Sequence, residues 1–183
     1  MLMHNGRLAD PLDEYTKALA KVSKKTKKTE DDHIEMADIE FEAGVYWRED
    51  IGCNVPSDNI FACILAAAKK FKEGPKCIGI QVEDDVQLKF KDSKNYEKFK
   101  KNPDHRFRKA VNLRGQKVMR TRPMIPASWK ATIALELDGT EVDVEDVEKY
   151  LEVGGKRIGL GDWRPQKYGS FGTFTVEKVR EID

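Results

Sequence analysis

The residues best suited to chemistry lie in a glycine-rich segment near the C-terminus, GLGDWRPQKYGSFGTF, from Gly159 to Phe174. Its aromatic side chains can stack on unpaired bases, and its basic side chains can bind phosphate oxygens. Its glycines let a ligand approach backbone N–H groups closely. The segment therefore suits a single nucleic-acid strand, through Gly159, Gly161, Trp163, Arg164, Lys167, Tyr168 and Phe171. A structural interpretation stays open, in which Asp162 pairs with Arg164 and Pro165 fixes a turn.

A second candidate is the basic stretch RGQKVMRTRP. Arg114, Arg120 and Arg122 share a parity, so an extended strand would place them on one face. Lys117 would then lie on the other face. The planar guanidinium suits phosphate oxygens because it can donate two hydrogen bonds at once. We expect this stretch and the glycine-rich segment to form one continuous trough for a nucleic-acid strand.

Charge is strongly segregated along the chain, although 33 basic and 32 acidic residues leave a net charge of only +1. Residues 30–50 hold nine acids and one arginine, whereas residues 105–135 hold no acid and eight basic side chains. Residues 17–28 hold six lysines and no acid. Either these are solvated faces of opposite sign, or the basic stretches gather on one surface that meets a polyanion.

Recognised catalytic motifs are missing from the sequence. It contains no phosphate-binding loop, HExxH, GxSxG or CxxC pattern, and three isolated cysteines predict neither a zinc site nor a disulfide scaffold. A metal site at Asp31, Asp32 and His33 stays possible, as does an exposed polar turn. We expect no catalytic residue, no cofactor and no metal, with a metal-dependent ribonuclease as an alternative.

The elements that must position these residues follow from periodicity and capping. We predict a helix from Asp10-Pro11 and then a lysine-rich linker, so that residues 1–35 form an N-terminal extension. Period-two alternation predicts strands over residues 38–47, 78–82 and 129–137, and further strands over KVMRTRP and TFTVEKV. Two helices are expected between them: one capped by Ser57, and one capped by Asp143 and ended by Gly154-Gly155.

This order predicts an α+β protein with a ferredoxin-like (RRM-like) β-α-β-β-α-β core. Residues 83–116 are read as a basic, partly helical insertion between core strands. All 183 residues are expected to form a single domain. No apolar window approaches the roughly 18 residues of a membrane span, and the start of the chain lacks a signal-peptide pattern, so a cytoplasmic location is expected.

Three segments resemble the RAMP superfamily, and especially the backbone subunits of CRISPR effector complexes. They are VPSDNIFACILAAAKK, MRTRPMIPASWKATIALEL and GKRIGLGDWRPQKYGSFGTFTV. Short stand-alone chains of this type are associated with bacteriophages. The resemblance implies an RRM-like core, binding along single-stranded RNA and head-to-tail assembly. It also implies that Ser57 and Asn59 lie near the nucleic-acid backbone and that Arg120 and Arg122 lie near phosphates.

The sequence therefore predicts a non-enzymatic protein that binds single-stranded nucleic acid, RNA in preference to DNA, and that assembles as a homo-oligomer or filament along the strand. Asp31, Asp32 and Asp50 are all candidates for the family's cleaving aspartate, but its place is not fixed by the resemblance, so nuclease activity is not carried over. The alternative from another class is a phage protein–protein module that imitates or blocks a CRISPR effector complex. No membrane partner is expected.

Overall fold

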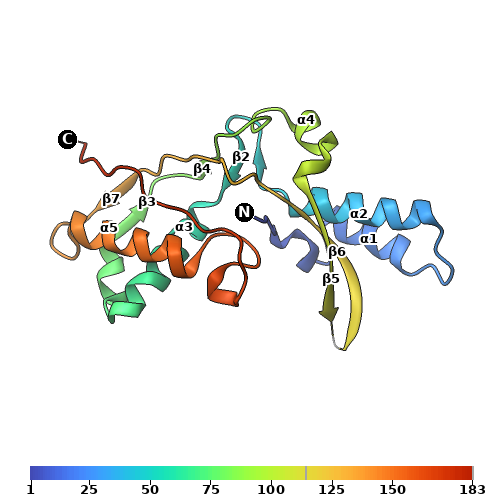
Figure 1. Ribbon diagram of the computed structural model, residues 1–183, viewed down its shortest axis with the longest axis horizontal. Coiled ribbons are helices and arrows are strands. Elements are labelled where there is room, and N and C mark those ends of the chain that lie inside the picture. The colour runs from blue at the N-terminus through green and yellow to red at the C-terminus, as the bar shows by residue number, and fades with distance from the viewer. Residues whose placement is uncertain (114, 183) are drawn as a thin grey trace. The chain divides into compact units, whose positions relative to one another are not determined.

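The computed structural model describes residues 1–113 and 115–182 and has mixed α and β structure with small sheets (Figure 1). The mixed class agrees with the α+β expectation. The chain forms two compact units, each described by itself. The N-terminal unit comprises Leu2–Cys53 and Phe90–Trp129, and the C-terminal unit comprises Asn54–Lys89 and Lys130–Asp183, with Met1. The expected single domain stays a prediction.

Two packed helices, α1 (Glu14–Ser23) and α2 (Glu30–Gly44), begin the N-terminal unit after a short 3₁₀ turn (Gly6–Ala9). The expected first helix starts later than Asp10, because Asp13 is the N-cap and accepts the N–H of Tyr15.

The predicted strand over residues 38–47 is wrong, because most of this segment belongs to α2. The helix starts at a capping box, in which Thr29 and Asp32 each accept the other's backbone N–H. α2 packs against both α1 and a strand, so Phe41 and Ala43 are both buried. Apolar residues two positions apart can therefore both be buried, which imitates the period of a strand.

An aromatic cluster fills the core beside α2. A short strand β1 (Trp47–Arg48) pairs antiparallel with the first half of β2 (Gly52–Val55). Trp47 stacks edge-on against Tyr96 at 5.1 Å between ring centroids, and Phe99 lies 5.6 Å from Phe41. Phe99 belongs to α4 (Tyr96–Lys101), which is followed by a 3₁₀ turn (Pro103–His105). Trp47 is half-buried at the edge of this aromatic cluster.

A β-hairpin completes the N-terminal unit. Strands β5 (Arg106–Leu113) and β6 (Gln116–Pro123) pair antiparallel over their whole length, with Lys109 opposite Arg120. α2 packs against β6 (Figure 1). The strand expected at KVMRTRP is confirmed. The insertion expected over residues 83–116 is partly helical, as predicted, and it also holds β5, which was not predicted.

Two helices and short strands form the C-terminal unit. α3 (Ser57–Ala68) packs against α5 (Val144–Val153) around Ile64 and Tyr150, which are fully buried. β3 (Ile80–Val82) pairs antiparallel with β7 (Leu135–Leu137), and the second half of β2 pairs with β4 (Val86–Gln87). Short helical turns complete the unit: Lys69–Phe71, Gly74–Gly79, Gly154–Ile158 and Pro165–Lys167.

Two expectations for this unit need correction. The strand expected over residues 129–137 is regular only at Leu135–Leu137. Gly154 is the C-cap of α5, as predicted, and the backbone then continues into a π-helical turn, Gly154–Ile158. No strand is assigned over residues 173–182, where TFTVEKV predicted one. The cap by Asp143 is confirmed, since its side chain accepts the N–H of Asp146 at 2.8 Å.

All three cysteines are buried, free thiols, which agrees with the expected absence of a disulfide scaffold. Burial raises the pKa of Cys63 to about 11 and raises the pKa of Cys53 and Cys77 as well. In the part of the chain that the structure describes, no helix has both the length and the apolar character needed to cross a membrane.

Candidate nucleic-acid interface

The glycine-rich segment forms a closed loop after the π-helical turn. The N–H of Leu160 donates to the carbonyl of Gly172 at 2.9 Å, and the N–H of Phe171 donates to the carbonyl of Trp163 at 3.0 Å. Gly169 permits a close approach, because a Cβ atom there would lie 1.8 Å from the Trp163 carbonyl oxygen. The loop's own hydrogen bonds therefore hold its backbone in one course.

Two of the predicted contact residues are used inside this loop. Arg164 donates from Nη1 to the carbonyl of Gly161 at 3.0 Å and from Nε to Oε1 of Gln166 at 3.2 Å. Trp163 is half-buried, and its N–H donates to the side chain of Asp162 at 2.9 Å. The Arg164 side chain therefore bonds within the loop, and the Trp163 side chain is only partly exposed.

A structural role inside the loop also fits Gly159, Gly161 and Phe171. Both glycines have left-handed backbone conformations, with φ of 76° and 77°, which favour glycine over other residues. Gly159 is buried, and the side chain of Phe171 is half-buried. These positions set the course of the backbone.

Tyr168 is displayed on the outside of the loop. Its relative exposure is 103%, although its N–H donates to the carbonyl of Pro165 at 3.0 Å. Lys167 is also exposed. Lys156 and Arg157 are exposed on the π-helical turn, which packs against the short helix that bears Lys167. An exposed aromatic ring and three exposed cations thus lie on or next to two contacting turns of the C-terminal unit.

Ser57 and Asn59 lie in the first turn of α3. The N-cap is Pro56 rather than Ser57, which corrects the predicted cap. The N–H of Ser57 donates to the carboxylate of Asp85 at 2.9 Å. Asp85 therefore supplies the negative charge that the positive end of a helix dipole favours. Sequence reasoning missed this residue, and the adjacent acids Asp84 and Asp85 were its only signal.

The hairpin places its basic residues on two faces. Arg120 and Arg122 share one face of β6, and Lys117 lies on the other, as their parity predicted. Arg120 forms an ion pair with Glu40, whose second oxygen accepts the N–H of Thr121 at 2.8 Å. Its guanidinium therefore faces a buried carboxylate. Arg114 lies outside the described residues.

Acidic α2 neutralises part of the basic hairpin region, which explains the charge segregation in part. Besides the pair at Glu40, Arg106 lies 2.5 Å from Asp38 and Lys100 lies 2.7 Å from Glu42. Arg106 also covers the ring of Phe41 at 4.5 Å. Exposed basic side chains remain on the hairpin: Arg108, Lys109 and Lys117.

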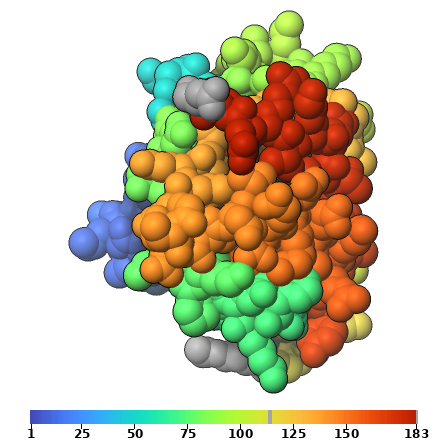
Figure 2. Space-filling view, turned by 90° about the vertical axis from the view of Figure 1, so that its left-hand side faces the viewer, coloured from blue at the N-terminus to red at the C-terminus, as the bar shows by residue number. Residues whose placement is uncertain are grey.

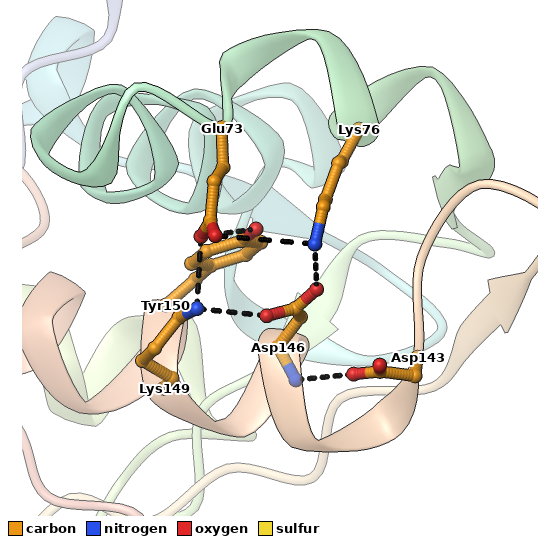
Figure 3. A network of polar contacts seen from close by, with 6 residues as sticks. All are labelled: Glu73, Lys76, Asp143, Asp146, Lys149 and Tyr150. Carbon is orange, nitrogen blue, oxygen red and sulfur yellow. Dashed lines mark hydrogen bonds and ion pairs between the residues drawn. The ribbon is translucent and has the colours of Figure 1, made fainter.

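A second polar cluster joins α5 to the turns after α3 (Figure 3). Lys149 lies 2.8 Å from Glu73 and 2.7 Å from Asp146, and Lys76 lies 2.5 Å from Asp146. The hydroxyl of Tyr150 donates to Glu73 at 2.9 Å. Hydrogen bonds from Lys149 lower the pKa of Glu73 and of Asp146. Each charge has an opposite neighbour, so the cluster acts as a clamp and offers no free acid or base.

The candidate metal residues form the first turn of α2 rather than a pocket. Asp32 is buried and bonded to Lys25, and this bond together with the N–H of Thr29 lowers the pKa of Asp32 to about 2. Asp31 and His33 are exposed and lie two residues apart in a helix, where each residue turns by about 100°, so their side chains diverge. Within residues 1–113 and 115–182, no group of three or more potential ligands could hold a metal ion.

The predicted trough was to join hairpin arginines with the glycine-rich loop. The hairpin belongs to the N-terminal unit, whereas the loop, Ser57 and Asn59 belong to the C-terminal unit. The structure thus brings the loop residues together in one unit, and it adds Lys156 and Arg157, which sequence reasoning missed. Comparisons of the chain with protein-family models, with curated proteins and with solved structures find no match.

Proposed function

We propose that this chain binds single-stranded nucleic acid, RNA in preference to DNA, without cleaving it. The observation that carries the proposal is the display of Tyr168, a fully exposed aromatic residue on a backbone fixed by hydrogen bonds. A ring in water buries no apolar area, so it gains little for folding. The same ring can stack on any base, which is worth about 1–3 kcal/mol for each base.

The surroundings of Tyr168 support the same function. Lys156, Arg157 and Lys167 are exposed on the two adjoining turns, where they can neutralise phosphates. The internal hydrogen bonds of the loop reduce the ordering that binding would otherwise require. A stacking ring beside cations matches what an unpaired strand offers, namely base faces and phosphates.

We further propose a ferredoxin-like arrangement for the C-terminal unit. Its helices and strands follow the order β2, α3, β3, β4, β7, α5, in which β4 is an addition to the ferredoxin-like order. Two features support the proposal: β3 pairs antiparallel with β7, and α3 packs against α5. The resemblance of the glycine-rich segment to RAMP proteins supports the preference for RNA and head-to-tail assembly along the strand. A phage origin and a role beside CRISPR complexes stay predictions of the same resemblance.

The substitution Tyr168→Ala tests the proposal directly. Loss of one stacked base weakens binding of a labelled oligonucleotide by about 5- to 150-fold, since stacking supplies about 1–3 kcal/mol. Tyr168→Phe keeps the ring and retains most of the affinity. Fluorescence anisotropy with RNA and DNA oligonucleotides of the same sequence measures both variants and the preference for RNA.

Salt titration of the wild-type protein provides the control for phosphate contacts. The logarithm of the affinity falls with the logarithm of salt concentration by about 0.7 for each phosphate neutralised on a single strand. Absence of oligonucleotide binding at low salt, or equal binding by Tyr168→Ala and wild type, overturns the proposal. A protein indifferent to oligonucleotides would instead fit the alternative of a protein–protein module.

A further inference from the structure

The outer face of α5 carries a row of acidic side chains. Glu145, Glu148 and Glu152 are exposed and follow one another at intervals of three and four residues, so they lie on one face of the helix. The opposite face buries Val147 and Tyr150. The start of α5 and the turn before it, in orange, lie at the surface in Figure 2. None of the three glutamates forms an ion pair with a residue in 1–113 or 115–182.

The stability of α5 explains only part of this row: Glu145 lies in the first turn, where the helix dipole favours an acid, whereas Glu148 and Glu152 lie beyond it. Like charges three and four residues apart destabilise a helix. Asp146 and Lys149 already provide the ion pairs that hold α5 in place. The three outer glutamates therefore present negative charge that a positive partner would offset.

A matching row of cations lies on α1. Lys17, Lys21 and Lys24 are exposed at intervals of four and three residues, and the buried Val22 marks the opposite side of the helix. Lys24 is the C-cap residue and keeps the right-handed helical conformation. In the part of the chain that the structure describes, these three lysines also lack ion-pair partners.

The two rows are complementary when the helices run antiparallel. Along α5 from Glu145, the glutamates are spaced by three and then four residues. Along α1 in the reverse direction from Lys24, the lysines are also spaced by three and then four residues. Both rows span about 10 Å at a rise of about 1.5 Å per residue. Antiparallel alignment would pair Lys24 with Glu145, Lys21 with Glu148 and Lys17 with Glu152, and it also sets opposite helix-dipole ends side by side.

We infer that α1 of one copy of this chain docks on α5 of a second copy through these three pairs of charges. The inference deepens the proposed function, because it rests on the proposed head-to-tail assembly and names its contact. The contact joins two different surfaces, so each added copy leaves a new α1 and a new α5 for the next. Exposed ion pairs are individually weak, and neighbours held on one strand meet at a raised effective concentration.

Charge reversal with mixing tests the contact. The first variant carries Lys17→Glu, Lys21→Glu and Lys24→Glu, and the second carries Glu145→Lys, Glu148→Lys and Glu152→Lys. Each variant alone would face like charges and self-associate at least about tenfold more weakly than wild type. An equimolar mixture restores association, because each reversed row then meets a complementary one. Sedimentation velocity at low and high salt, without nucleic acid, provides the measurement.

The outcomes separate this contact from folding and from strand binding. The reversed residues are exposed, so both variants keep the far-ultraviolet circular dichroism and melting temperature of wild type within a few degrees. Tyr168→Ala self-associates like wild type if strand binding alone is impaired. Failure of the mixture to restore association, unchanged association of either single variant, or a wild type that stays monomeric at low salt overturns the inference.

Discussion

Two aromatic residues of the glycine-rich loop have left-handed backbone conformations, Trp163 at φ 46° and Tyr168 at φ 59°. A non-glycine residue pays roughly 1–2 kcal/mol for this conformation. Positive φ alone does not mark a function, since Lys72 ends a short helix in the same way at φ 64°. At Tyr168 the cost is combined with complete exposure, so the ring gains no burial in return.

The substitution Tyr168→Gly separates the contribution of the ring to strand binding from the cost of the left-handed backbone to stability. Relief of left-handed strain gains roughly 1–2 kcal/mol, and the flexibility of glycine in the unfolded chain costs roughly 0.5–1 kcal/mol. We therefore expect unchanged or slightly higher stability in chemical denaturation, together with the weak strand binding of Tyr168→Ala. A clear loss of stability would show that the ring serves the fold.

Arg120 illustrates how an interpretation changes once contacts are known. From sequence it is a phosphate ligand, but it is paired with Glu40, whose carboxylate is only 3% exposed. Arg120→Ala leaves that carboxylate without its cation and costs about 3 kcal/mol of folding free energy. Lys117→Ala, an exposed site on the same strand, stays within about 0.5 kcal/mol of wild type in urea denaturation. Equal stability of the two variants contradicts the structural role of Arg120.

At the scale of elements, the clamp around Lys149 links α5 to the turns after α3. The pKa values of Glu73 and Asp146 are lowered from 4.5 and 3.8, chiefly by hydrogen bonds from Lys149. A lowered pKa means that the stabilisation is present above the ordinary pKa and is lost as pH falls through the folded-state value. The clamp therefore weakens in acid and is unaffected near neutral pH.

This gives a pH prediction for Lys149→Met, which keeps the aliphatic stem but removes the charge. Wild-type melting temperature falls as pH drops from about 5 to about 3, in part because Glu73 and Asp146 bind protons. The variant melts at a lower temperature near pH 7 and shows a shallower decline in acid. Differential scanning calorimetry over this range measures both slopes, and parallel slopes would contradict the clamp.

Elements with local signals were predictable from the sequence, and elements defined by partners were not. α5 follows Asp143, whose side chain caps it, and β6 shows its alternation plainly. α2 was mistaken for a strand because it is buried on two sides, which removes the single apolar stripe of a helix. At the site, the sequence indicated the loop but not which of its residues face solvent, because the full exposure of Tyr168 and the half-burial of Trp163 depend on the course of the backbone.

At the scale of the whole molecule, acids and bases are nearly equal in number, but different groups of acids have different roles. Part of the acidic charge neutralises the hairpin region through Asp38, Glu40 and Glu42. Another part, Glu145, Glu148 and Glu152 on α5, has no ion-pair partner among the described residues and is inferred to meet α1 of a second copy. Opposite charges placed on separate surfaces favour association between copies at low ionic strength, whereas the same charges paired internally favour folding.

The enclosure of the cysteines has a practical consequence. Thiolates rather than thiols react with maleimides, and Cys53, Cys63 and Cys77 hold their protons because they are shielded from water. The three natural cysteines therefore do not react with alkylating dyes while the protein is folded. A cysteine introduced at exposed Ser170 can then be labelled while the three natural cysteines stay in place. This would place a fluorophore two residues from Tyr168, whose ring is proposed to stack on the strand.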